Sequence, residues 1–143
     1  MSGRNNVGTY SFESTVALVN NNEIESFGEG GIVWEPTQSW TKFVGIDGAV
    51  ARSYASLTGV LNLYIAQTGD SNDILNDLLI EDMVTKKKIV PVSISDPLGR
   101  TEIFVTHGWV QKMPQISWLK DISVNQWMID LGRIDVLKIG GNG

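Results

Sequence analysis

The stretch that decides the fold class is residues 58–84, which read TGVLNLYIAQTGDSNDILNDLLIEDMV. Its first part, residues 59–66, alternates along the chain, and this alternation predicts a β-strand with two different faces. One face carries Leu61, Leu63 and Ile65, and the other carries Asn62, Tyr64 and Ala66.

The second part predicts the one convincing helix of the chain, over about residues 71–84. Its apolar positions fall on one helical stripe, which consists of Ile74, Leu75, Leu78, Leu79 and Met83. Asp70 or Ser71 is placed to cap the first backbone N–H groups of this helix. A strand that leads into one amphipathic helix indicates a sheet covered by a single helical lid.

Further alternating runs predict strands at residues 10–19, 23–27, 32–35, 89–95, 102–110, 116–119, 122–131 and 134–139. Asn20–Asn22 and Asp96–Gly99 are typical turns, and the glycines of residues 28–31 predict a β-bulge or a turn. The fold class is therefore mainly β (α+β), a β-sandwich or split barrel of antiparallel strands with one packed helix. Residues 1–143 form a single domain, and residues 1–9 form a flexible N-terminal arm.

Composition sets the broad class. The chain has 143 residues, of which 42% are hydrophobic and 19% charged, as in a folded globular domain. It has no cysteine, so disulfides and thiolate chemistry are excluded. Its first residues do not resemble a signal peptide, and no apolar run reaches the roughly 18 residues of a membrane helix. We expect a protein made in a cytoplasm, or exported by a route other than Sec.

The net charge of −5 hides an asymmetry between the two halves of the chain. Residues 1–84 hold 3 Lys/Arg against 11 Asp/Glu, whereas residues 85–143 hold 8 against 5. The opposite charges of the two halves would suit a head-to-tail contact between copies. Random variation in charge along the chain explains the difference as well. The acidic balance argues against tight nucleic-acid binding. Lys86–Lys88 follow the helix, where they complement its dipole.

A long excursion, residues 36–56, interrupts the strand pattern. It contains Trp40 and Phe43, and its Asp47-Gly48 step is a strong tight-turn signal. The excursion either lies on its own core, which the sequence alone favours, or reaches a neighbouring subunit.

The inventory for catalysis is poor. His107 is the only histidine, and no second histidine supplies a metal pair. Asp70, Asp73 and Asp77 lack calcium-loop spacing, so helix capping explains them better. The pairs Glu23/Glu25 and Asp130/Asp135 are of the kind that chance produces in an acidic chain. We expect no enzyme, no metal and no cofactor.

The five tryptophans (Trp34, Trp40, Trp109, Trp118 and Trp127) exceed what one small core needs, which favours a protein that buries surface against other chains.

Several segments resemble the tube proteins of contractile bacteriophage tails, specifically a small phage family formerly of unknown function. These segments are Ser11–Asn20 with Glu23, Ile24 and Phe27–Gly30; Val44–Ser53; Gly59–Leu63 with Gln67, Thr68 and Ser71–Leu75; and Pro91–Ile94, Asp96–Gly99, Trp109, Lys112, Pro114 and Trp127. The similarity is in register along almost the whole chain, and residues 34–40 depart from it.

The resemblance implies a structural virion protein, assembled in the host cytoplasm and located in the phage tail. Hexameric rings would join their sheets into one β-barrel and stack into the inner tube, the conduit for genome ejection. Implied partners are other copies, the tail sheath, tape-measure, baseplate and tail terminator proteins, with DNA only in transit and no membrane. An acidic lumen would let DNA slide. The candidate interface residues are Trp40, Phe43, Asp47, Gly48, Arg52 and Tyr54, and the candidate lumen- or partner-facing residues are Asn62 and Tyr64.

Two alternatives stay open. One is the tube subunit of a type VI-like contractile injection system, which shares the fold. The other is a β-barrel module that binds a small ligand, although no aromatic cluster in the sequence predicts its pocket.

Overall fold

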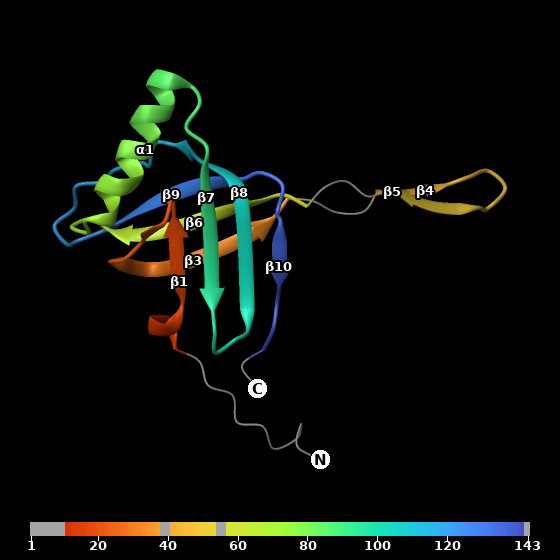
Figure 1. Cartoon of the computed structure of the whole chain (residues 1–143), viewed down its shortest axis with the longest axis horizontal. Coiled ribbons are helices and arrows are strands. Elements are labelled where there is room, and N and C mark those ends of the chain that lie inside the picture. Colours follow the sequence, from red (N-terminus) through yellow and green to blue (C-terminus); the bar gives the residue numbers. More distant parts are fainter. Residues whose placement is uncertain (1–10, 38–40, 54–56, 142–143) are drawn as a thin grey trace, which may run out of the picture.

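The computed structural model describes residues 11–37, 41–53 and 57–141, which contain one α-helix, one short 3₁₀ turn and ten strands (Figure 1). In chain order these elements are η2 (Phe12–Ser14), β1 (Val16–Val19), β2 (Asn22–Glu23), β3 (Phe27–Pro36), β4 (Thr41–Val44), β5 (Val50–Ser53), β6 (Gly59–Ala66), α1 (Ser71–Thr85), β7 (Val90–Asp96), β8 (Thr101–Lys112), β9 (Val124–Leu131) and β10 (Val136–Lys138).

Eight of the strands form one antiparallel sheet in the order β2-β1-β7-β8-β9-β6-β3, with β10 also paired to β8. The long strand β8 joins two layers, because its residues 102–104 pair with β10 and its residues 108–112 pair with β9. Figure 1 shows β1, β7, β8 and β10 aligned along one axis, with neighbours antiparallel, and crossing β3, β6 and β9 at a steep angle. The expected mainly β fold with one helix is confirmed.

The core lies where the two layers face each other, under helix α1. Leu61, Leu63 and Ile65 are fully buried, so the predicted alternation of β6 is confirmed. The crossing layer contributes buried side chains from β1, β7 and β8, namely Ala17, Val19, Val92, Ile94, Ile103 and Val105. Burial of this apolar surface is the main favourable term in the stability of the domain.

Helix α1 covers the core with Leu75, Leu78 and Leu79, as its stripe predicts. The prediction for Met83 is wrong, because this side chain is 61% exposed. The last turn of α1 extends past the edge of the sheet (Figure 1), where no strand can cover it. Lys86 ends the helix in the left-handed conformation, and its N–H donates to the carbonyl of Asp82.

The N-terminus of α1 differs from expectation. Asp70 occupies the N-cap position in a helical conformation, and its side chain makes no capping hydrogen bond. The hydroxyl of Ser71 accepts a bond from the backbone N–H of Glu25, 2.8 Å away. The prediction that either residue caps the helix is therefore wrong, because Ser71 ties the helix to the chain before β3.

Asn72 holds the first turn of α1 to the sheet. Its amide nitrogen donates to the carbonyls of Ala66 and Gly69, at 3.0 and 2.9 Å. Its carbonyl oxygen accepts from the indole N–H of Trp127 at 2.8 Å and from the amide of Asn125 at 3.1 Å. One side chain thereby links α1, the end of β6 and the start of β9.

Three predicted strands are shorter than expected or absent. Within residues 10–19 the described part begins with the 3₁₀ turn η2, and only Val16–Val19 form a strand. Its core face carries Ala17 and Val19, whereas Leu18 is half-buried. Residues 23–27 divide between β2 and β3, because Ser26 has a positive φ of 62° that turns the chain. Residues 116–119 form a loop.

The predicted turns at Asn20–Asn22 and Asp96–Gly99 and the predicted bulge at residues 28–31 are confirmed. The register of β3 against β6 shifts between Phe27 and Ile32, so the glycine-rich stretch is a β-bulge. Gly30 and Gly31 have positive φ angles of 101° and 57°. An added Cβ at Gly30 would lie 2.7 Å from Cγ of Tyr64, so this position needs glycine for space as well as for its conformation.

Candidate assembly surfaces

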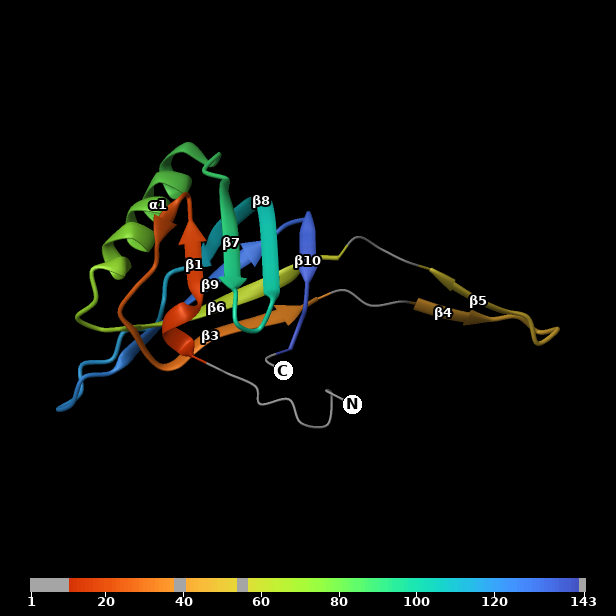
Figure 2. The same ribbon diagram turned by 60° about the horizontal axis from the view of Figure 1, so that its bottom comes forward.

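Residues 41–53 form a β-hairpin that projects from the body of the molecule (Figure 2). Among the described residues, β4 and β5 pair with each other in a two-stranded sheet of their own. At its tip the backbone N–H of Ala49 donates to the carboxylate of Asp47, and Gly48 has a φ of 85°. The tight turn at Asp47-Gly48 is therefore confirmed.

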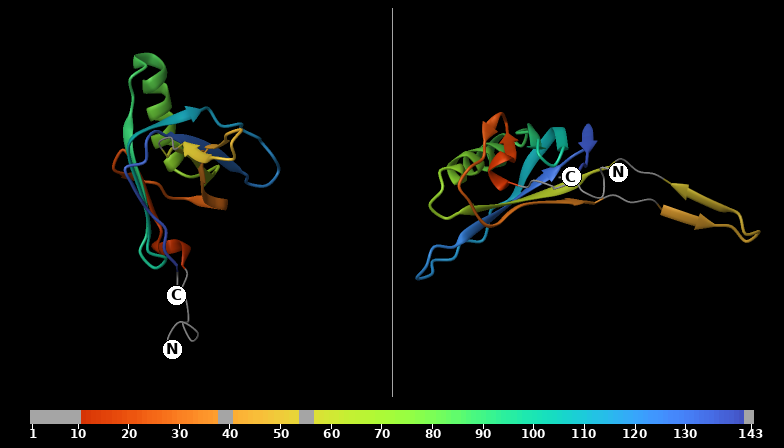
Figure 3. Two further views of the ribbon diagram at one scale, coloured as in Figure 1. Left: turned by 90° about the vertical axis from the view of Figure 1, so that its right-hand side faces the viewer. Right: turned by 90° about the horizontal axis from the view of Figure 1, so that it is seen from below.

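The preferred interpretation that residues 36–56 lie on their own core is wrong for this hairpin. Seen from below, it points away from the crossing strands (Figure 3). Val44, Ile46 and Val50 are exposed, and Ile46 at the tip is fully so. A lone two-stranded hairpin is marginally stable in water. Its exposed apolar side chains mark it as a surface for contact with another chain.

The six candidate interface residues divide into three groups. Asp47 and Gly48 form the hairpin tip. Phe43 lies opposite Ala51 in the hairpin register, and Arg52 lies opposite Lys42. Trp40 and Tyr54 lie outside the described residues.

Asn62 and Tyr64 lie on the face of the sheet that points away from the core, as predicted. Tyr64 is half-buried and packs over Gly30. Asn62 is only 6% exposed and accepts a hydrogen bond from the amide of Gln126 at 3.1 Å. The prediction that Asn62 presents itself to a lumen or a partner needs correction, because cross-strand neighbours cover its side chain within one chain.

The strand register identifies the other positions on this outer face. They include Val33 and Glu35 on β3, Val60 and Ala66 on β6, Val124, Gln126, Met128 and Asp130 on β9, and Trp109 and Lys112 on β8. The face carries two acids and one base, so it is close to neutral and not strongly acidic. Burial raises the pKa of Asp130 above its ordinary value. A hollow of about 400 Å³ opens beside Tyr64 and Lys112.

The edges of the sheet are a second kind of surface. Within the described part of the chain, β3 pairs with β6 along one side, and its other side forms the edge of the sheet. Strand β10 likewise pairs with β8 on one side. Exposed edges offer backbone N–H and C=O groups to a further strand, and a closed assembly of several copies removes them.

The loop between β8 and β9 also exposes five apolar side chains, four of which lie in the strands predicted at residues 116–119 and 122–131. They are Met113, Ile116, Trp118, Leu119 and Ile122. Trp118 is the most exposed member of the set. The excess of tryptophan in the sequence was the one signal that pointed to this loop.

Within residues 11–37, 41–53 and 57–141, the side chains form no evident catalytic centre. No group of three or more His, Asp or Glu side chains suited to a metal ion occurs in the described ranges. His107 is exposed, and its Nδ1 lies 2.8 Å from the hydroxyl of Thr106. Asp135 accepts from the backbone N–H and the hydroxyl of Thr106, and these bonds lower the pKa of its carboxyl. None of the described helices is long and apolar enough to cross a membrane.

Two solved structures share this arrangement of strands and helix. A chain in the cryo-EM structure of the sheath/tube terminator of an extracellular contractile injection system, PVC, superimposes with a TM-score of 0.62 at 10% identity, over 91% of this chain and 96% of that one. The chain has the fold of a contractile injection system component. A chain of the PVC sheath-tube complex in the extended state also matches with a TM-score of 0.62 at 10% identity, over 87% of this chain and 88% of that one. No protein-family model and no curated protein matches the sequence.

Proposed function

We propose that this chain is a structural subunit of the tube of a contractile tail, in which hexameric rings stack into a conduit. The projecting hairpin of residues 41–53 carries the proposal, on a fold that also occurs in a sheath-tube complex. A monomer gains nothing from a hairpin that exposes Val44, Ile46 and Val50. In an assembly of copies the same side chains are buried.

The outer face of the sheet fits the wall of the conduit. Strands β8, β9, β6 and β3 present one continuous surface that carries Tyr64. Lateral pairing of the β3 edge with the next copy would close six such sheets into a barrel and remove the exposed edge. A nearly neutral surface would hold DNA weakly, which suits a genome that passes through.

The proposed location is the tail of a phage virion, and the proposed partners are the sheath, tape-measure, baseplate and terminator proteins. Two other roles for the chain predict different assemblies. A tube subunit of a contractile injection system would form the same rings. A terminator, favoured by the match over 96% of the PVC terminator chain, would form single rings that do not stack.

Negative-stain electron microscopy of the purified chain tests the proposal. We expect six-fold rings or tubes from the wild type, and loss of them in the variant Ile46→Asp, which places a charge at the fully exposed hairpin tip. Ile80→Asp, which changes an exposed apolar side chain on α1, is the matched control and should still assemble. A wild type that stays monomeric at high concentration contradicts the proposal, and single rings without tubes favour the terminator.

A further inference from the structure

The C-terminal end of helix α1 has an apolar surface that nothing in the described part of the chain covers. Met83 and Val84 lie in the last turn of the helix, which extends past the edge of the sheet (Figure 1). Their side chains are 61% and 77% exposed, and Ile89, which follows the helix, is 52% exposed. We call Met83, Val84 and Ile89 the helix tip. Several large apolar side chains exposed within one short segment mark a surface for contact with another chain.

The helix tip carries a short run of positive charge. Lys86 and Lys87 are exposed, and Lys88 is half-buried. Of these three lysines, only Lys88 has an acidic partner among the described residues, since its Nζ lies 3.4 Å from the carboxylate of Glu81. A surface complementary to this tip combines an apolar recess with nearby carboxylates.

A recess of this kind lies beside β3, where the core is open to solvent. Ile32 and Trp34 pair with Leu63 and Leu61, so they lie on the core face of β3, yet both are only half-buried. The space beside them is a hollow of about 270 Å³, which we call the open hollow. Its lining is mostly apolar and includes Phe12, Ile32, Trp34, Ile94, Ile103 and Ile139. A cavity of about 150 Å³ can hold a benzene molecule, so the open hollow has room for two apolar side chains.

The open hollow adjoins a group of carboxylates. Phe12 and Thr15 line both the open hollow and a second hollow of about 390 Å³. The lining of the second hollow includes Glu13, Glu23 and Glu25. All three glutamates are exposed, and no lysine or arginine lies among the described residues that line this hollow. An apolar zone and a charged zone therefore lie next to each other on both surfaces, with opposite charge.

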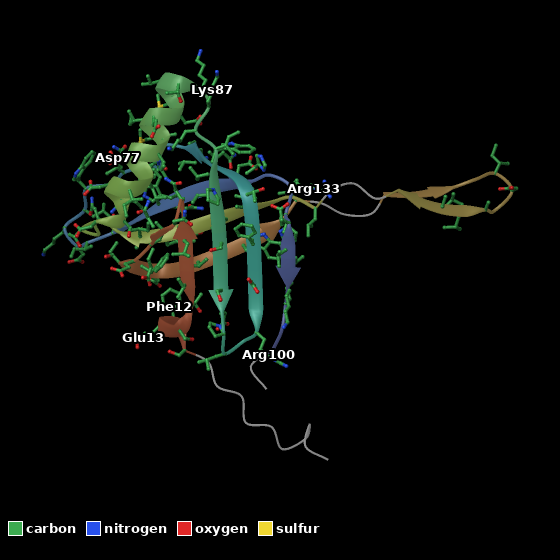
Figure 4. The ribbon with its side chains drawn as sticks, in the orientation of Figure 1. Phe12, Glu13, Asp77, Lys87, Arg100 and Arg133 are labelled. Carbon is green, nitrogen blue, oxygen red and sulfur yellow. The ribbon has the colours of Figure 1, made fainter. Side chains whose placement is uncertain are left out.

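The two surfaces lie at opposite ends of the body. Figure 4 shows Lys87 beyond one end of β7, and Phe12 and Glu13 near the other end. In the sheet order β8-β9-β6-β3, helix α1 lies against β8 and the open hollow lies beside β3. A copy that brings its β8 side to the β3 edge of its neighbour therefore also brings its helix tip toward the open hollow. Such a contact joins two different surfaces, and it closes into a ring where the rotation between copies allows closure.

We propose that the helix tip of one copy packs into the open hollow of the next copy in the ring, with Lys86 and Lys87 against the glutamates of the second hollow. The inference rests on the proposed function and identifies a lateral contact within each ring. Association removes the apolar side chains of both surfaces from water, which favours binding. Charge complementarity fixes the register and disfavours other partners.

Electron microscopy and sedimentation of the purified full chain test the apolar part of the contact. We expect Val84→Asp to lose rings and tubes at the concentration at which the wild type forms them, because a charge would have to enter an apolar hollow. Ile80→Asp is the matched control, because it makes a similar change at an exposed position one turn before the helix tip, and it should still assemble. Circular dichroism checks that both variants are folded.

Charge reversal with rescue tests the polar part of the contact. Lys86→Glu/Lys87→Glu should lose rings and tubes at the concentration at which the wild type forms them. Glu13→Lys/Glu23→Lys should fail in the same way. The combination of all four changes should restore assembly, because it exchanges the two charges across the same contact.

A matched control for the rescue places the new lysines elsewhere on the body. It combines the reversal of Lys86 and Lys87 with Asp77→Lys/Asp121→Lys, at exposed positions on α1 and in the loop between β8 and β9. The net charge changes by the same amount as in the rescue, and assembly should not return. Assembly restored equally by this control contradicts the contact between the lysines and the glutamates.

Disulfide trapping tests which copies are joined, because the chain has no cysteine of its own. A chain that carries both Val84→Cys and Thr15→Cys should form, on oxidation, a ladder of crosslinked species that ends at the hexamer. A ladder that stops at the dimer, or one that continues past the hexamer, contradicts a contact within the ring. The control chain with Val84→Cys and Asp77→Cys should give no ladder.

The outcomes separate this inference from the proposed function. A wild type that forms no rings contradicts the proposed function. A wild type that assembles, together with a Val84→Asp variant that assembles equally well and no crosslinked ladder, contradicts only the inference. The N-terminal segment is the other candidate for the open hollow, because it precedes Phe12 in the chain. If a chain without residues 1–9 loses assembly and Val84→Asp does not, that segment fills the hollow and the inference is overturned.

Discussion

Asn72→Ala is the substitution for which the structure allows the most detailed prediction. The side chain of Asn72 makes four hydrogen bonds that join α1 to β6 and β9. Truncation at Cβ removes all four. The carbonyls of Ala66 and Gly69 keep backbone donors, because the N–H groups of Gly69 and Asn72 bond to them. The two donors on β9 lose the partner that they share.

These two donors determine the expected cost. The indole N–H of Trp127 and the amide of Asn125 belong to residues that are 3% and 7% exposed. A buried donor without a partner costs about 1–3 kcal/mol, so two such donors cost about 2–6 kcal/mol. Asn72 itself is half-buried, so water can reach part of the vacated space. Alanine also has the higher helix propensity, by about 0.5 kcal/mol. We therefore expect a loss of about 2–4 kcal/mol in the free energy of unfolding.

Urea unfolding followed by circular dichroism measures this loss, at a concentration where wild type and variant have the same oligomeric state. Asn76→Ala is the matched control, because it makes the same chemical change on α1 and no hydrogen bond of the Asn76 side chain is found among the described residues. We expect the control to change the free energy of unfolding by less than about 0.5 kcal/mol. If the two variants are equally stable, Asn72 does not join the helix to the sheet.

Two further predictions concern the bulge and the dependence of stability on pH. Gly30→Ala should cost about 2–4 kcal/mol in the free energy of unfolding, because the new Cβ would clash with the ring of Tyr64 and the backbone φ is 101°. Gly48→Ala is the control, because φ is 85° there and no atom lies within 4 Å of an added Cβ. This control should cost less in the same urea titration. The pKa of Asp135 is lowered in the folded protein, so its bonds to Thr106 stabilise the fold at pH values above 3.8, the ordinary pKa of Asp. This contribution is lost as the pH falls through the pKa of Asp135 in the folded state. In an acid titration, Asp135→Asn should therefore lose less stability than the wild type. The raised pKa of Asp130 has the opposite sign, so stability should fall as the pH rises through 3.8 toward the folded value, and Asp130→Asn should remove that fall. Equal acid titrations of wild type and both variants would contradict these two assignments.

Local chemistry made much of the fold predictable. The period of two in residues 59–66 identified Leu61, Leu63 and Ile65, because alternation alone decides which side chains share a face of a strand. The helical stripe identified Leu75, Leu78 and Leu79 for the same kind of reason. The turn at Asp47-Gly48 and the bulge at residues 28–31 follow from backbone conformations that few residues adopt.

The candidate site was predictable only in part. The sequence indicated the excursion of residues 36–56, and the structure shows a projecting hairpin within it. Exposure could not be inferred in the same way, because it depends on neighbours from distant parts of the chain. Asn62 is covered by Gln126, and Met83 is exposed because the sheet ends before the helix does.

The sequence by itself determined the fold class, the central strand and helix, the main turns, and the acidic balance of the first half of the chain. Tertiary structure alone decided that Asn72 joins three elements and that η2, β2 and β3 bring glutamates and two phenylalanines into one groove. Periodicity records only which neighbours along the chain share a face. Contacts between residues more than 50 positions apart, such as that of Asn72 with Trp127, exist only after the layers have packed.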